Sequence, residues 1–90
     1  MNKRIEIKIR GIVQGVLFRQ GTKSLADKHG IVGFARNEKD ETVTIVAEGK
    51  EEALDELIRF VRMGPQHAQV ENIDVTKERA TDSFEHFNIF

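Results

Sequence analysis

The apolar residues change their spacing across one glycine-bearing stretch, RGIVQGVLFRQG, at residues 10–21. Before it, from Lys3 to Arg10, isoleucines alternate with charged or polar residues, and this period of two is typical of a half-buried strand. After it, the spacing becomes helical and ends at a glycine, which predicts a first helix of about three turns. The fold therefore opens with a strand that leads through a loop into a helix. The residues at helical spacing are Phe18, Thr22, Leu25, Ala26 and His29, followed by Gly30.

The middle of the chain predicts a hairpin and a second helix. IVGFARN (31–37) and TVTIVAEG (42–49) have the composition of strands, and the polar EKDE between them indicates a tight turn. Residues 51–63 then place apolar side chains on one helical face, with acids in the first turn and arginines in the last, an order that suits the helix dipole. Gly64 and Pro65 end this helix.

Two further extended pieces, at residues 70–77 and 84–90, close the chain. The order is thus strand, helix, strand, strand, helix, strand and a short final extended piece. Two helices on one face of an antiparallel sheet give an α+β fold, the ferredoxin-like βαββαβ sandwich. Because 90 residues support a single core, we expect one domain spanning residues 1–90.

Composition argues against several classes of protein. The chain has no cysteine, which removes disulfides, thiolate zinc sites and cysteine nucleophiles. Its net charge is −1 with both signs interspersed, which disfavours binding to nucleic acid. No stretch approaches the ~18 apolar residues of a membrane span, and the opening MNKRIEIKIR lacks the apolar centre of a signal peptide. We therefore expect a cytoplasmic protein with no membrane partner and, by default, a monomer.

The stretch at residues 10–21 has the composition of an anion-binding loop. It leads into the N-terminus of a helix, where several N–H groups have no intrahelical acceptor and the dipole presents partial positive charge. Gly11 and Gly15 let the backbone turn sharply so that its amides converge, and Arg19 adds a guanidinium that can bind phosphate or carboxylate through two donors. The stretch is neither a Walker loop nor a Rossmann glycine motif. A plain chain reversal followed by an exposed arginine explains the same residues as well.

Several stretches together resemble the acylphosphatase family. GIVQGVLFR (11–19) is similar to the family's first signature, and GFARN through TVTIVAEG (33–49) is similar to the second, which includes Asn37. GPQHAQV (64–70) and the phenylalanine-bearing last strand add further matches in the same order, so that the resemblance covers essentially the entire chain. It implies a ferredoxin-like hydrolase that cleaves the carboxyl–phosphate anhydride of acyl phosphates into a carboxylate and inorganic phosphate.

The resemblance also implies roles for single residues. Arg19 matches the phosphate-binding arginine, and Asn37 matches the asparagine that positions the attacking water. Val13 and Phe18 match positions that pack the loop onto the core. No metal and no cofactor are implied, since a guanidinium and converging amides can supply the charge stabilisation that phosphoryl transfer needs. The implied phosphate loop is the backbone of Gln14, Gly15, Val16, Leu17, Phe18 and Arg19.

Three positions depart from the family's usual pattern, and one of them is Phe34, which stands where larger aromatic residues are common. A glycine is usual in the hairpin where this chain has Glu41. Since glycine there supplies a positive φ at little cost, we expect this hairpin to turn differently, with Asp40 in the left-handed conformation. We also expect a small change in the direction of the Asn37 side chain, because Asn37 directly precedes the turn. Leu17 stands where small residues are common, and we expect its side chain to point away from the loop's anion site.

Other functions stay open from the sequence alone. A non-catalytic module that binds phosphate, acyl phosphate or a partner on the same fold would keep the loop and lack turnover. An RNA-recognition module needs exposed aromatic residues on its central strands, and RIEIKIR and TVTIVAEG have none. The acylphosphatase-like domain of hydrogenase maturation carbamoyltransferases is a third possibility, although we expect a stand-alone enzyme.

Metal and nucleophile chemistry have little support. His29, His67 and His86 lie far apart with no ligand spacing, and we expect them at the end of the first helix and on the surface. Ser24 and Ser83 do not stand in the elbow motif of a serine triad.

Overall fold

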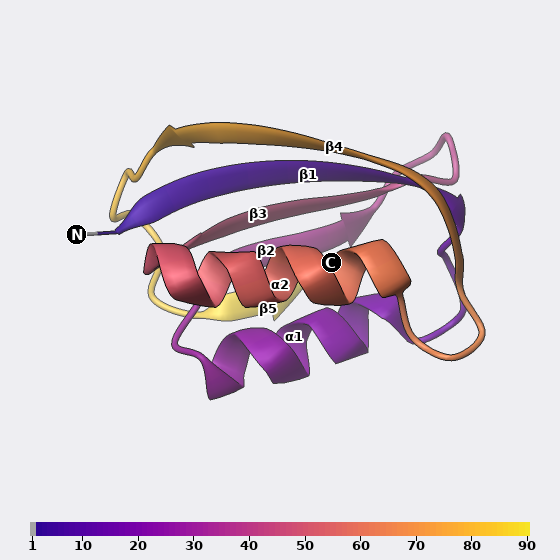
Figure 1. The fold of residues 1–90 in the computed structure, drawn as a ribbon, viewed down its shortest axis with the longest axis horizontal. Helices are drawn as coiled ribbons and strands as arrows, with labels where there is room; N and C mark the ends of the chain where they lie inside the picture. The colour runs from indigo at the N-terminus through magenta and orange to yellow at the C-terminus, as the bar shows by residue number, and fades with distance from the viewer. Residues whose placement is uncertain (1) are drawn as a thin grey trace.

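The structure is a computed structural model and describes residues 2–90. Its order of strand, helix, strand, strand, helix, strand and short final strand confirms the predicted order (Figure 1). The elements are β1 (Lys3–Ile12), α1 (Phe18–Lys28), β2 (Val32–Asn37), β3 (Val43–Gly49), α2 (Glu51–Met63), β4 (Gln69–Arg79) and β5 (Phe87–Ile89).

The strands form one sheet in the order β4-β1-β3-β2-β5, and both helices lie on the same face of it (Figure 1). β1 pairs antiparallel with β3 and β4, and β2 pairs antiparallel with β3. β5 pairs parallel with β2, so the prediction of a wholly antiparallel sheet is wrong at one edge. The physical reason is that the chain crosses the sheet after β4 and enters β5 at the end where β2 begins. The α+β, ferredoxin-like prediction is otherwise confirmed.

The predicted inner face of the first strand is the centre of the core. Ile5, Ile7 and Ile9 are all buried beneath the helices, as the period of two indicates. Burial of each such side chain contributes about 1.5–3 kcal/mol. The helices meet this face with Phe18, Thr22 and Ala26 from α1 and with Leu54, Leu57 and Val61 from α2.

β3 is more buried than its sequence predicts. Alternation in TVTIVAEG predicts one buried face, yet every residue from Val43 to Gly49 is buried. β3 is the central strand, with β1 and β2 on its two sides. Its outer face is covered as well, because Thr44 and Glu48 bind neighbouring side chains and a later segment of the chain. The sequence of one strand does not show what crosses its second face.

The boundaries agree closely with the predicted ones, with one difference that matters for the site. α2 occupies residues 51–63 as predicted, and Gly64 ends it with a φ of 71°. β1, however, continues through a register shift at Arg10/Gly11 as far as Ile12. The segment between β1 and α1 is therefore only residues 13–17.

In the part of the chain described, no helix is long and apolar enough to cross a membrane.

Gly33 gives a test of the sheet's close packing. Its φ is 139°, and a Cβ added there would lie 1.9 Å from the backbone oxygen of Val46 on β3. Neither strand can retreat without loss of ladder hydrogen bonds, so we expect Gly33→Ala to lower the free energy of unfolding by about 3 kcal/mol or more in urea denaturation. Gly30→Ala is the control, because its φ is 70° and a Cβ there meets nothing within 4 Å. That control should lose only about 1–2 kcal/mol. Equal losses in the two variants would contradict the clash.

Candidate active site

The loop between β1 and α1 is fixed at both ends and left open in its middle. Val13 and Phe18, at its two ends, are buried in the core, which confirms their predicted packing role. Between them, Gly15 has a φ of 74° and Leu17 a φ of 62°. Residues in the left-handed conformation turn successive N–H groups toward a common side, and such concave arrangements bind anions. The sequence indicated this geometry for Gly15 and did not indicate it for Leu17.

The backbone N–H groups of this loop have no acceptor of their own. Within residues 2–90, no hydrogen bond is found from the N–H groups of residues 14–18, and the first such bond runs from Gly21 back to the oxygen of Leu17. Leu17 occupies the N-cap position of α1 and makes no side-chain capping bond. The loop therefore presents a set of donors at the positive end of the helix dipole.

Arg19 lies in the first turn of α1 and is held by the last strand. Its Nη1 donates to the backbone oxygen of Phe90 at 2.5 Å. A guanidinium carries five N–H donors, so this bond fixes the group while leaving other donors for a ligand. The sequence indicated Arg19 as the cation of an anion-binding loop and gave no sign of its partner, which lies 71 residues away along the chain.

Asn37 is the last residue of β2 and is paired with Val43 on β3. Its Oδ1 is buried and has no hydrogen-bond partner within residues 2–90. Buried polar atoms nearly always have a partner, and an exception in a native fold calls for an explanation such as a catalytic role or a bound water. This orphaned acceptor separates Asn37 from an ordinary strand-end asparagine.

Gln14 connects the loop to the hairpin that follows Asn37. Its Nε2 donates to the backbone oxygens of Glu38 at 2.8 Å and Thr42 at 2.9 Å. Both oxygens also accept bonds within the hairpin, from the N–H groups of Glu41 and Glu38 respectively. The Gln14 bonds are therefore additional to the hairpin's own, and they link the loop to the segment next to Asn37. The sequence indicated Gln14 only as part of the loop backbone.

The predicted site residues thus meet at one end of the sheet. The loop follows the end of β1, Asn37 ends β2, and Phe90 follows β5, which runs parallel to β2. The N–H of Phe90 bonds to the oxygen of Ala35 on β2, so that the partner of Arg19 lies beside the strand that carries Asn37.

The hairpin turns at a different residue from the one predicted. Glu41 has a φ of 71°, and Asp40 is not among the residues with positive φ, so the prediction for Asp40 is wrong. The reason is that the Asp40 carboxylate accepts bonds from the Thr42 hydroxyl and backbone N–H, at 2.5 and 3.2 Å. An aspartate that accepts a bond from the N–H two residues ahead forms an Asx turn, and in this chain the residue inside the turn, Glu41, takes the left-handed conformation.

The hairpin's carboxylates are stabilised in their charged form. Hydrogen bonds from the Thr42 hydroxyl and backbone, together with Lys8, lower the pKa of Asp40 to about 2. A hydrogen bond from Thr44, followed by one from Arg36, lowers the pKa of Glu38 below its usual value. The turn next to Asn37 is therefore held by ionised groups at neutral pH.

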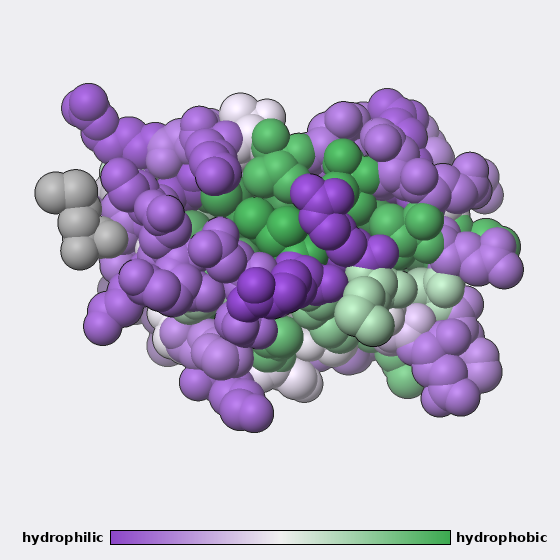
Figure 2. Space-filling model, in the orientation of Figure 1, coloured by the Kyte–Doolittle hydropathy of each residue, from purple (hydrophilic) through white to green (hydrophobic). Residues whose placement is uncertain are grey.

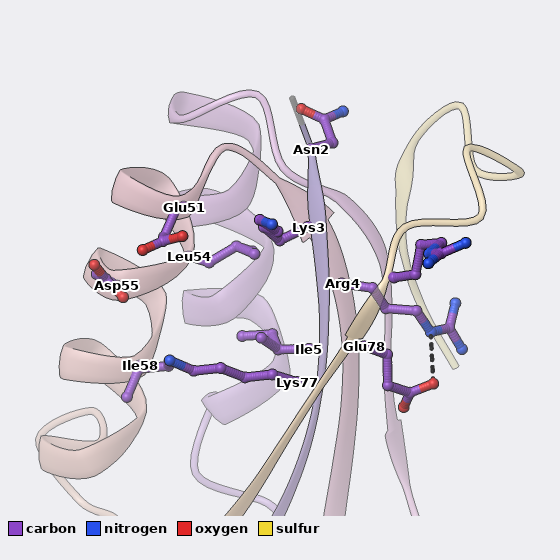
Figure 3. A pocket seen from close by; sticks show the side chains of 11 residues that line it. Asn2, Lys3, Arg4, Ile5, Glu51, Leu54, Asp55, Ile58, Lys77 and Glu78 are labelled. Atoms are coloured by element: carbon purple, nitrogen blue, oxygen red, sulfur yellow. Dashed lines mark ion pairs between the residues drawn. The ribbon is translucent and has the colours of Figure 1, made fainter.

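A cavity of about 650 Å³ lies elsewhere, between α2 and the strands β1 and β4 (Figure 3). Figure 2 shows apolar side chains gathered in the centre of the face seen there, with polar side chains around them. None of the loop residues lines this cavity, so the cavity is separate from the predicted anion site. The lining residues are Asn2, Lys3, Arg4, Ile5, Glu51, Leu54, Asp55, Ile58, Lys77, Glu78 and Arg79.

The three histidines occupy the positions expected from the sequence. His29 caps the end of α1, and His67 and His86 are exposed. Across residues 2–90, no group of three or more His, Cys, Asp or Glu side chains is arranged to hold a metal ion.

Comparison with known proteins identifies the relatives of this chain. The acylphosphatase family model matches residues 5–89. The chain belongs to the acylphosphatase family. An acylphosphatase from Salinibacter ruber is 44% identical over 87 residues, which cover 97% of this chain and 92% of that protein. The crystal structure of acylphosphatase from Bacillus subtilis has a TM-score of 0.93 and 36% identity, and the match covers 100% of this chain and 99% of that one.

Acylphosphatase-like folds also occur within longer proteins. The structure of full-length HypF in its phosphate- and nucleotide-bound form matches with a TM-score of 0.91 and 27% identity, over 100% of this chain and 12% of that chain. The relatives named acylphosphatase, in contrast, are matched over most of their length. These comparisons confirm the predicted family, fold class and hydrolase function.

The low pKa of Asp40 gives a pH test of the hairpin. In the unfolded chain this carboxyl has its ordinary pKa of 3.8, whereas in the folded chain the pKa is about 2. Its contribution to stability is therefore complete above about pH 4 and is lost as the pH falls toward about 2. We expect urea denaturation of Asp40→Asn to show a shallower loss of stability between about pH 4 and pH 2 than the native chain. Identical slopes for the two proteins would contradict this assignment.

Proposed function

We propose that the chain hydrolyses acyl phosphates to a carboxylate and inorganic phosphate, at the end of the sheet where the loop at residues 13–17 meets the hairpin. The observation that carries the proposal is the run of N–H donors at residues 14–18 without acceptors, next to Arg19. Donors in this arrangement fit the oxygens of a phosphoryl group. Membership of the acylphosphatase family supports this class of substrate.

In the proposed complex, the loop binds the phosphoryl group. The backbone N–H groups from Gln14 through Gly15, Val16, Leu17 and Phe18 donate to its oxygens, and Arg19 adds a fixed positive charge. These donors are already in place before the substrate binds. Such preorganised donors stabilise the charge that develops in a transition state, and loss of one of them typically costs about 10²–10³ in rate.

Asn37 is proposed to orient the attacking water. A neutral amide cannot take up a proton at neutral pH, so Asn37 acts by hydrogen bonding alone. The water oxygen attacks phosphorus, the bond from phosphorus to the acyl oxygen breaks, and its electron pair leaves on the carboxylate. The water proton passes to a phosphoryl oxygen of the substrate. Because a carboxylate is a stable leaving group, the reaction needs no general acid, and the donors named above need no metal.

The same proposal describes a monomeric cytoplasmic enzyme whose only partners are the small substrate and its products. The loop, Arg19 and Asn37 all belong to one chain, and each is fixed by contacts within that chain. A second copy is not needed to complete the site.

Substitution of the two proposed catalytic residues tests this function. We expect the native chain to hydrolyse benzoyl phosphate in the presence of EDTA, and Arg19→Ala to lower kcat/KM by about 10²–10³ because a charged donor is removed. Asn37→Ala should lower kcat by about 10² or more because the water loses its orientation. Release of inorganic phosphate measures both effects.

Glu41→Gly is the matched control, because glycine readily takes the left-handed conformation that Glu41 already has. We expect it to keep the native rate. Full activity of Arg19→Ala or Asn37→Ala would overturn the site assignment. A native chain that binds inorganic phosphate and does not hydrolyse benzoyl phosphate would identify the chain as a non-catalytic binding module instead.

Gln14→Leu tests whether the link between loop and hairpin matters for catalysis. The carbonyl oxygens of Glu38 and Thr42 keep their hairpin bonds without Gln14, so we expect a stability loss of only about 1 kcal/mol. The loop is no longer fixed relative to Asn37, so kcat/KM should fall by about tenfold or more. Gln66→Leu, at an exposed glutamine outside the loop, is the control. If Gln14→Leu retained the native kcat/KM, the link would have no part in catalysis.

A further inference from the structure

The segment between β4 and β5 has to cross the whole sheet. β4 and β5 are its two edge strands, with β1, β3 and β2 between them. Strands in a sheet lie about 4.8 Å apart, so this crossing covers about 19 Å. Residues 80–86, called the crossing segment below, reach at most about 25 Å when fully extended. The length of the segment is only slightly greater than the distance it crosses, so its path depends on the residues that bind it.

Glu48 holds the crossing segment where it passes β3. The Glu48 side chain is 1% exposed, although glutamate is rarely buried without a partner. Its carboxylate accepts bonds from the N–H of Thr81 at 3.0 Å, the hydroxyl of Thr81 at 2.7 Å and the N–H of Asp82 at 2.9 Å. Burial alone would raise the pKa of Glu48, but these donors and Arg4 hold it below its usual value. Glu48 is thus ionised and bound to the segment at neutral pH.

Arg4 completes the cluster from the neighbouring strand. Arg4 lies opposite Glu48 in the pairing of β1 with β3 and opposite Glu78 in the pairing of β1 with β4. Its Nη1 lies 3.1 Å from Glu48 and its Nε 3.7 Å from Glu78. Figure 3 shows Arg4 and Glu78 on the side of the sheet away from α2. The Arg4 guanidinium also lies over the ring of Phe84, in the crossing segment, at 5.8 Å.

The crossing segment leads directly to the group that holds Arg19. The oxygen of His86, the last residue of the segment, accepts a bond from the N–H of Gly33 on β2. β5 then follows, and Lys23 on α1 donates to the oxygen of Phe87 at 2.7 Å. Next comes Phe90, whose oxygen accepts the bond from Arg19. Residues 81–90 therefore form one continuous segment, bound to the Glu48 carboxylate at its start and to the Arg19 guanidinium at its end.

We infer that Glu48 is a positioning residue for the anion site: it fixes the crossing segment, and the segment in turn places the Phe90 oxygen that orients Arg19. This inference rests on the proposed function for its effect on phosphate binding. An arginine held in its binding geometry before the ligand arrives loses less conformational entropy on binding than a mobile one. Release of the segment would allow the Arg19 side chain to move, and the proposed phosphoryl site would bind more weakly.

Glu48→Gln tests the inference with little change in size. A glutamine side chain has one acceptor oxygen where glutamate has two, so it cannot accept all three bonds from Thr81 and Asp82. Its NH₂ group would instead face at least one of these donors, which releases the crossing segment. We expect the inhibition constant for inorganic phosphate and the KM for benzoyl phosphate to rise about fivefold, which corresponds to the loss of one oriented side chain. In an Arg19→Ala background, the same substitution should cause no further change, because Arg19 is the residue through which Glu48 acts.

Two further variants keep the test decisive. Val61→Ala removes core contacts of α2, which lies on the face of the sheet opposite Arg4 (Figure 3), so it lowers Tm and should leave the phosphate constant unchanged. Thr81→Val, at an exposed position, removes only the hydroxyl donor and should raise the phosphate constant about twofold, even if Glu48→Gln fails to fold. The inference would be overturned if Arg19→Ala weakened phosphate binding while folded Glu48→Gln kept the native inhibition constant for phosphate. If Glu48→Gln does not fold, the same comparison is made with Thr81→Val.

A second readout separates this inference from the proposed function. The side-chain N–H signal of Arg19 in ¹H–¹⁵N NMR reports its hydrogen bond to Phe90 without any substrate. We expect the signal to shift and broaden in Glu48→Gln and in Thr81→Val and to stay in place in Val61→Ala. If the native chain neither hydrolyses benzoyl phosphate nor binds phosphate, the proposed function fails, and this signal still decides the role of Glu48. An unchanged Arg19 signal in both Glu48→Gln and Thr81→Val would refute the positioning role of Glu48.

Discussion

Three strands, β1, β2 and β5, finish at the same end of the sheet, and the candidate site depends on this direction of the chain. β1 and β2 each pair antiparallel with β3, so they run the same way, and β5 runs parallel with β2. The loop that follows β1, the asparagine that ends β2 and the residue that follows β5 are brought together as a result. No single element holds the site. It is held by hydrogen bonds that join the ends of these elements, from Gln14 to the hairpin and from Arg19 to Phe90.

The fold, the loop and Arg19 are predictable from the sequence because they depend on local patterns, whereas Asn37 is indicated only by the resemblance to the acylphosphatase family. The alternation around Ile5, Ile7 and Ile9 predicts the buried face of β1, and the charges and Gly64 predict both ends of α2. The loop is recognisable from its glycines and Arg19 at the start of a helix. Each of these features depends on residues that are close together in the sequence, where spacing and propensity determine the structure.

The contacts that orient the site are not predictable in the same way, because they join residues far apart in the chain. The partners of Gln14 and Arg19 are backbone oxygens, which have no signature in the sequence. The left-handed Leu17 and Glu41 also escape prediction, since the surrounding structure imposes a conformation that these residues rarely take alone. The parallel β5 escapes it too, because it is three residues long and its direction follows from the path of the crossing segment.

The distance along the chain between Arg19 and Phe90 has a consequence for synthesis. A nascent chain that has emerged from the ribosome as far as β4 already contains the loop, Asn37 and most of the core. Its Arg19 still has no oxygen to bind, because the last strand is missing. Contacts of such long sequence separation form late in folding, since closure of the large loop has to precede them. The Arg19–Phe90 bond therefore forms only after the last strand has been synthesised.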